Sequence, residues 1–330
     1  STPGWGRSGA WQVREVARTD ASDPAALAGD LVALLRPLRS CRSTASLCVA
    51  APTSTLRVLT LRAADAAHVP QAVAAELPSL LPFEVDRAQH AFRIRRQQRV
   101  EDALECTVTV AACEAALLQQ TLDALWRAGW PTYRAIPAAL ALAHTAKALG
   151  VTDADPVILM DFGERQTTIV LLEHGEPIYA RDVTLGHEHV TDALMGQVTF
   201  GGGTLSLSRE EAAALKRDTG VPEPQAGMTV GPRQIPIATY LALVQPILEQ
   251  LVSEIRRTMT FGARAAKATA PVRVMISGGG LHVPHLDAWL AKQLGVPVTR
   301  LDCSRLLGPS GAADAVACGL ALGDEQGLRI

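Results

Sequence analysis

The chain has 330 residues, of which 48% are hydrophobic and 19% charged, so it can bury a sizeable core and does not resemble a disordered chain. With 31 basic and 33 acidic residues its net charge is −2, which excludes a global basic field for nucleic acid as a partner. No apolar run reaches the ~18 residues of a membrane-spanning helix, so we expect no span within this chain. The six cysteines form no CxxC pair, which favours reduced thiols in the cytoplasm over disulfides or a zinc site.

The first half of the chain mixes strand and helix signals. Alternating or apolar runs predict strands over Ala10–Ala17, Ser46–Ala50, Thr55–Arg62, His90–Arg96 and Leu104–Ala112. Helices are predicted over Asp23–Leu38, Asp65–Leu81 with an interruption near Pro70, Glu114–Ala128 and Pro137–Leu149. Gly129–Thr132 is predicted as a turn, and the basic run Arg93–Arg99 as a solvated strand end or loop.

The composition changes at the polar segment Thr152–Pro156, which we interpret as the main domain boundary. Beyond it, strands are predicted over Val157–Met160, Thr167–Leu172, Pro177–Val183, Val272–Ile276 and Val296–Leu301. Helices are predicted over His189–Gln197, Ser208–Arg217, Ile237–Ala265, Leu286–Leu294 and Ala312–Leu322, with a loop over Pro222–Pro236. Helices between strands in both halves predict two α/β lobes with a cleft between them.

The first segment with recognisable chemistry is the turn after the predicted strand Val157–Met160. It places a carboxylate, Asp161, before Gly163 and the hydroxyls of Thr167 and Thr168. Glycine lets backbone N–H groups approach a phosphate, hydroxyls donate to its oxygens, and a carboxylate can hold Mg²⁺ through water. From these residues alone, a hairpin turn that uses Asp and Gly only for its geometry is the stronger interpretation.

Two further segments could border the same cleft. Ser277 is followed by Gly278, Gly279 and Gly280 between a buried strand and a helix, an arrangement that lets a flat base or ribose come close. A flexible turn explains this glycine run equally well. The helix that begins at Ser208 carries Lys216, and a capping box between Ser208 and Glu211 accounts for its start.

Taken together, these segments resemble the PilM family, actin-like cytoplasmic proteins of type IV pilus assembly that are related to FtsA. The stretch from Val157 to Thr168 resembles the family's "ALVDIGASTT", and Gly175–Gly186 resembles "DGRLVFTREIPIGG". The segment Leu251–Arg257 resembles "LVREIRRS", and Val274–Leu290 resembles "ILLTGGGARLPGLAEYL". No single motif is decisive, but their order and spacing along most of the chain are specific.

The resemblance implies an actin-like (ribonuclease H-like) α/β fold with two lobes. Residues 1–155 would form the first lobe, with an inserted FtsA/PilM-type small subdomain at about 55–112. Residues 156–330 would form the second lobe, with a last helix at about 312–322 that returns to the first.

The resemblance also implies a function, an assembly platform. Its partner would be the cytoplasmic tail of a PilN-type inner-membrane protein, held in a groove of the first lobe, together with other pilus or secretion components at the inner face of the bacterial inner membrane. The resemblance implies ATP and Mg²⁺ between the lobes. Asp161 would hold Mg²⁺ through water, and Gly163, Thr167 and Thr168 would form the second phosphate loop. Lys216 would approach the sugar or base, and the adenosine would be bordered by Gly278, Gly279 and Gly280.

Four departures from the family pattern lie around this cleft. The "DIGSSSVK" hairpin that forms the first phosphate loop has no counterpart in Ser1–Trp11. Ala213 stands where relatives carry a glutamate, Ile136 where they carry a carboxylate before proline, and His187 where they carry the second glycine of a "GG" pair. Without both phosphate loops and a general base, attacking water is not positioned, so we expect weak or absent hydrolysis.

Two alternatives stay open at this point. The chain could be an active ATPase of the actin superfamily, or the cytoplasmic domain of a GspL-type protein of type II secretion, which resembles the same fold with a degenerate nucleotide pocket.

Overall fold

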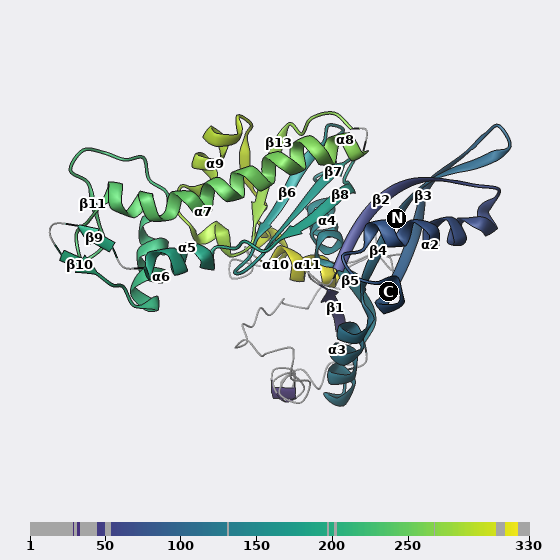
Figure 1. Ribbon diagram of the computed structural model, residues 1–330, viewed down its shortest axis with the longest axis horizontal. Helices are drawn as coiled ribbons and strands as arrows, with labels where there is room; N and C mark the ends of the chain where they lie inside the picture. The colour runs from purple at the N-terminus through teal and green to yellow at the C-terminus, as the bar shows by residue number, and fades with distance from the viewer. Residues whose placement is uncertain are drawn as a thin grey trace.

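A five-stranded mixed sheet forms the centre of the computed structural model (Figure 1). Its strands run in the order β14-β13-β6-β7-β8, with β6 and β13 parallel and β6, β7 and β8 an antiparallel meander. The bounds are β6 Val157–Phe162, β7 Thr167–Glu173, β8 Glu176–Val183, β13 Arg273–Ser277 and β14 Val298–Arg300. The structure describes residues 29, 32–33, 45–49, 54–130, 132–196, 198–200, 203–266, 268–307 and 314–322.

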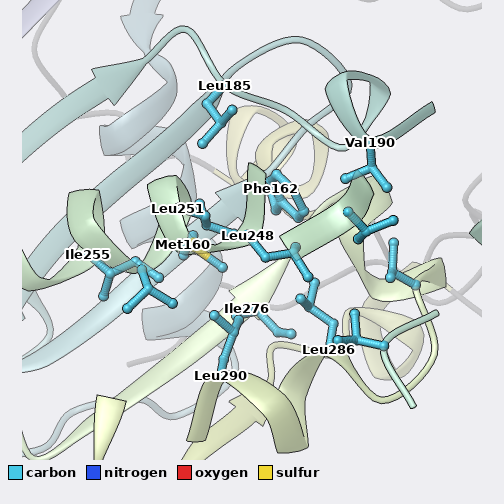
Figure 2. Close-up of a cluster of buried hydrophobic side chains, with 14 of the residues drawn as sticks. Met160, Phe162, Leu185, Val190, Leu248, Leu251, Ile255, Ile276, Leu286 and Leu290 are labelled. Carbon is cyan, nitrogen blue, oxygen red and sulfur yellow. The ribbon is translucent and has the colours of Figure 1, made fainter. Parts of the chain in front are cut away.

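Both faces of this sheet are buried, which is why its central strands are apolar on both faces along most of their length. Ile158 and Met160 of β6 belong to one hydrophobic cluster, whereas the alternate residues Val157 and Leu159 belong to another on the opposite face. The long helix α7, Ile237–Arg257, covers the first face, and Figure 2 shows its residues packed against those of β6 and β13. Helices α4, Ala138–Ala148, and α11, Ala315–Leu322, cover the second face.

The small subdomain is a three-stranded antiparallel sheet in the order β2-β4-β3, with one helix on its apolar face. Its elements are β2 Ser54–Ala63, α2 Val69–Leu80, β3 Ala88–Val100 and β4 Ala103–Glu114. Pro70 lies in the first turn of α2, where its missing N–H costs nothing, and Asp65 caps the preceding 3₁₀ turn Ala66–His68. The basic run Arg93–Arg99 lies within β3, an edge strand longer than predicted.

Next to the subdomain, β1 (Ala45–Val49) pairs in parallel with β5 (Thr132–Pro137), and α3 (Ala115–Arg127) joins β4 to β5. The last helix α11 packs on α4: the Thr145 hydroxyl donates to the Ala315 carbonyl at 2.6 Å, and a Cβ on Gly319 would overlap the Ala141 carbonyl. The final helix therefore contacts the half of the chain that precedes Thr152. The division into lobes at residue 155 stays a prediction.

The opposite end of the molecule from the small subdomain carries α5 and α6 with two short hairpins (Figure 1). The remaining elements are α5 Glu188–Leu194, β9 Val198–Phe200, β10 Gly203–Leu205, α6 Arg209–Thr219, β11 Thr229–Val230, β12 Ile235–Pro236, α8 Ala263–Ala266, α9 Leu286–Leu294 and α10 Ser304–Leu307. The Ser208–Glu211 capping box is present at the start of α6, as predicted.

Several predicted elements differ from the structure. The strand β5 was not predicted; it lies where a turn over Gly129–Thr132 and a helix from Pro137 were expected. The predicted loop Pro222–Pro236 contains the two short strands β11 and β12. The helix predicted to reach Ala265 changes to a π-helical turn over Thr258–Gly262. The predicted strand Ala10–Ala17 lies outside the described residues, as do most of the predicted helix Asp23–Leu38 and residues 312–313 of the last one.

Candidate functional site

The turns that follow β6 and β13 meet at one edge of the central sheet, because the two strands are parallel neighbours. Asp161 and Ser277 are partners in the register, and the Ser277 hydroxyl donates to Asp161 Oδ1 at 2.7 Å. Gly278 follows with a φ of +81°, and a Cβ there would lie 2.8 Å from the same carboxylate oxygen. This edge opens into a pocket of about 750 Å³, here called the strand-end cleft.

The cleft brings together some of the residues predicted to bind nucleotide and leaves others out. Asp161, Gly163, Lys216, Gly278 and Gly279 line it. Thr167, Thr168 and Gly280 are not among its lining residues. Gly280 packs against the Phe162 ring, which leaves no room for a side chain. Glycine at this position is therefore explained by packing in the core.

The predicted phosphate donors of the first turn are engaged within the protein. The Gly163 N–H donates to the Gln166 carbonyl at 3.1 Å, which closes the β6–β7 turn. The Thr167 hydroxyl is fully buried and donates to the Leu185 carbonyl at 2.5 Å. The Thr168 hydroxyl donates to Asp182 Oδ1 at 2.5 Å. In this structure the segment is a hydrogen-bonded hairpin turn.

A row of polar side chains crosses the sheet beneath the cleft. Ser277, Asp161, Thr168 and Asp182 are successive partners on β13, β6, β7 and β8, and they therefore share one face. Burial raises the pKa of Asp161 to about 6, with the nearby Asp314 and Asp182 adding to the rise and the Ser277 hydrogen bond opposing it. Burial also raises the pKa of Asp182. The row is acidic, and the charged form of Asp161 is disfavoured.

A second cluster, around Lys216, fills the α5–α6 side of the cleft. The Lys216 ammonium donates to Thr191 Oγ1 at 2.7 Å and to the His187 carbonyl at 3.1 Å, and lies 3.1 Å from His187 Nδ1. Glu188 Oε2 lies 3.7 Å from it. Burial lowers the pKa of Lys216, and Glu188 opposes this shift. Sequence reasoning found Lys216 and His187 but missed Thr191 and Glu188, which only the fold brings to them.

The imidazole of His187 is neutral at physiological pH. Burial, with a smaller contribution from the Lys216 charge, lowers its pKa to about 4. A neutral ring whose Nδ1 faces an ammonium accepts that hydrogen bond and carries its own proton on Nε2. The ring meets Phe162 edge to face at 6.2 Å, and a Cβ on Gly279 would overlap Nε2.

A second pocket of about 740 Å³, here called the subdomain groove, separates the small subdomain from the central sheet. Residues 93–95 of β3, Thr109 of β4, α4 and the β7–β8 turn line it. A register shift between Ile94 and Arg96 marks a bulge, and Arg95 reaches Glu176 across the groove at 3.4 Å. Thr109 is 1% exposed, and its hydroxyl has no hydrogen-bond partner among the described residues. Sequence reasoning did not identify this groove.

Among the described residues, no helix combines the length and apolar character needed to cross a bilayer. Within the same parts of the chain, no three His, Cys, Asp or Glu side chains are grouped so that they could hold a metal ion.

Comparison with known proteins identifies the relatives of this architecture. The sequence model of a family described as type IV pilus assembly protein PilM matches residues 13–324. A solved PilM-PilN type IV pilus biogenesis complex has a chain that is 23% identical, with a TM-score of 0.72, over 91% of this chain and 84% of that one. This match confirms the prediction of an actin-like α/β fold with a PilM-type small subdomain.

Two solved structures are more distant. The ethanolamine utilization protein EutJ from Carboxydothermus hydrogenoformans is 18% identical, with a TM-score of 0.41, over 62% of this chain and 61% of that one. MreB5 of Spiroplasma citri, bound to AMPPNP, is 11% identical, with a TM-score of 0.47, over 64% and 65%. Both scores lie below 0.5 and support no functional comparison.

Proposed function

This chain belongs to the PilM family of type IV pilus assembly proteins, and from that premise we propose that it is an assembly platform that holds the cytoplasmic tail of a PilN-type inner-membrane protein in the subdomain groove. The similar chain in the solved complex is found together with PilN, which supports a partner of this type. Through that partner the protein would work at the inner face of the inner membrane, next to other pilus or secretion components.

The observation that favours the groove is the buried hydroxyl of Thr109, which has no hydrogen-bond partner among the described residues. A buried hydroxyl without a partner costs about 1–3 kcal/mol, and the backbone of a bound peptide can supply the missing hydrogen bond to Thr109. Leu140 and Ile178 provide apolar wall for side chains of the tail. Arg93 is exposed beside them on β3, and among the described residues no other strand pairs with the outer edge of β3. Extended peptides bind such edges through main-chain hydrogen bonds.

A titration with a fluorescein-labelled peptide of the PilN-type tail tests this assignment. Arg93→Glu removes a donor and adds a second carboxylate near Glu176, so it should weaken tail binding at least about tenfold, the effect of losing one hydrogen bond to a charged group. Arg99→Glu is the matched control, because Arg99 is exposed on the same strand and does not line the groove. No binding by the intact protein, or equal losses in both variants, would contradict the proposal.

The strand-end cleft supports the binding function over the ATPase alternative. ATP and Mg²⁺ are the cofactors that the family resemblance implies, and Asp161 is the residue that would hold Mg²⁺ through water. The residues present do not fit Mg-ATP. The Gly163 N–H and the hydroxyls of Thr167 and Thr168, which would donate to its phosphates, already donate to acceptors within the protein. The acidic row disfavours a polyphosphate further. We infer that the cleft is degenerate.

A phosphate-release assay with Mg-ATP separates the two functions. We expect the same background rate for the wild-type protein and for Asp161→Ala. Turnover by the wild type that the substitution abolishes would establish the ATPase and overturn the inference of a degenerate cleft.

A further inference from the structure

We propose that His187 keeps a purine nucleotide out of the strand-end cleft. Its imidazole covers the face of Gly279 that would otherwise be open to the ligand, and it accepts a hydrogen bond from Lys216 that a ligand could otherwise accept. The proposal rests on the degenerate cleft inferred above and adds a side chain that blocks it to the turn donors already named. It does not depend on what the subdomain groove binds.

The His187 ring occupies space that a flat ligand would need. Gly279 lines the cleft, and a glycine leaves its Cα face open to a flat ligand. Here the His187 ring covers that face, since a Cβ on Gly279 would overlap Nε2. The edge-to-face contact with Phe162 holds the ring in this position. A base or ribose at Gly279 would have to displace an imidazole that is packed on its other side.

The hydrogen-bond donors of Lys216 are directed at acceptors within the protein. A lysine ammonium has three hydrogen-bond donors and no acceptor. Those of Lys216 face Thr191 Oγ1, the His187 carbonyl and His187 Nδ1, so none is left for a ligand. Because the ring is neutral, its Nδ1 is an acceptor and this third contact is favourable. The Lys216 charge is also offset by Glu188 at 3.7 Å.

The backbone at residue 187 does not require a histidine. Its φ of −66° and ψ of −16° are ordinary helical values that any residue adopts without strain. A smaller residue at this position would therefore change the space in the cleft and leave the chain path as it is. The His187 N–H still donates to the Gly163 carbonyl at 2.9 Å, a contact that does not involve the side chain.

The experiment compares binding of a fluorescent N-methylanthraniloyl-ATP with Mg²⁺ to the full chain and to two variants. His187→Gly should bind at least about tenfold more tightly than the wild type, since one donor of a charged group is released and the Gly279 face is opened. His282→Gly is the matched control: His282 lines the same cleft but is exposed and makes no contact with Lys216 in the hydrogen bonds of the described residues, so its affinity should equal that of the wild type.

Thermal unfolding confirms that each variant is folded, and His187→Asn provides a second variant should the glycine destabilise α5. Asparagine uncovers Gly279 in the same way but keeps an acceptor for Lys216, so its gain should lie between those of wild type and His187→Gly. Equal affinity of wild type and both His187 variants would overturn the proposal, as would an equal gain in His282→Gly. The tail peptide is titrated against the same samples, and its failure to bind would count against the groove alone.

Discussion

The strand-end cleft and the subdomain groove have nearly the same volume, about 750 and 740 Å³, but differ in how their polar groups are paired. In the cleft, the ammonium of Lys216 has its partners within the protein, as do the hydroxyls of Thr167 and Thr168 beside the turn that borders it. In the groove, the buried hydroxyl of Thr109 has none among the described residues. An unpaired buried group is costly, so it is retained where a ligand completes it. The difference favours the groove as the binding site and the cleft as a structural remnant.

The two pockets also differ in the charge of the residues around them. The cleft edge holds the carboxylate of Asp161 close to Asp182 and Asp314, and burial pushes the pKa of Asp161 to about 6. In the groove, Glu176 is shared by Arg95 at 3.4 Å and Lys147 at 3.2 Å, and opposite charges offset each other. A polyphosphate meets repulsion in the first pocket, whereas the second is close to neutral. Three stability measurements test this contrast directly.

The largest effect is expected from Asp161→Asn. The pKa of Asp161 in the folded protein, about 6, lies above the ordinary 3.8, so the folded state binds this proton more tightly than the unfolded state. Stability from this group is complete below pH 3.8 and is lost as the pH rises through about 6. The difference of about two pKa units corresponds to about 2–3 kcal/mol at pH 7, which the uncharged amide of the variant would recover.

Urea unfolding of the wild type and of Asp161→Asn between pH 4 and pH 7 checks this expectation. The variant should be more stable at pH 7 and should lose the part of the pH dependence that lies between about 4 and 6. An unchanged pH profile, or a variant less stable at pH 7, would show that a cation compensates the charge of the Asp161 carboxylate. The cleft would then not be the structural remnant inferred above.

A smaller effect, in the opposite direction, is expected from Thr191→Val. The substitution keeps the volume of a fully buried side chain but removes the acceptor that lies 2.7 Å from the Lys216 ammonium. Loss of a hydrogen bond to a charged group should lower the free energy of unfolding by about 2 kcal/mol, measured by urea denaturation at pH 7. Thr60→Val, at an exposed threonine of β2, is a control with an expected change within about 0.5 kcal/mol. A Thr191→Val protein as stable as the wild type would mean that Lys216 is not held as tightly as its contacts indicate.

Much of the central sheet could be predicted from sequence because its strands have a strong local signal. Val157–Met160, Thr167–Leu172 and Val272–Ile276 are mostly apolar, as two-sided burial requires, and all three form strands. The short strand β5 was not predicted, because Gly129 and Pro131 precede it and Pro137 ends it, and glycine and proline favour turns and helix starts. Its pairing with β1 joins residues almost 90 positions apart, which no local pattern reveals.

The candidate site was predictable in position but not in detail. Parallel strands end at one edge, so Asp161 and Gly278 had to lie close together. Neighbouring strand residues point to opposite faces, so Thr167 and Thr168 separate, and their hydroxyls donate to the Leu185 carbonyl and to Asp182. The contacts of His187 with Lys216 span 29 positions and depend on how α6 packs on α5.

The smallest effect, and the one that most sharply separates the two pockets, is expected from Thr109→Val. Thr191→Val should lower the free energy of unfolding, whereas Thr109→Val should leave it unchanged or raise it by up to about 1 kcal/mol. The reason is that Thr109→Val removes a buried hydroxyl that has no partner among the described residues. Urea denaturation of both valine variants under one condition gives the comparison. The substitution should also weaken binding of the PilN-type tail peptide, since the peptide loses the hydroxyl that it would satisfy. Destabilisation equal to that of Thr191→Val would show that Thr109 is already paired in the free protein, and the groove would then lose the feature that marks it as a binding site.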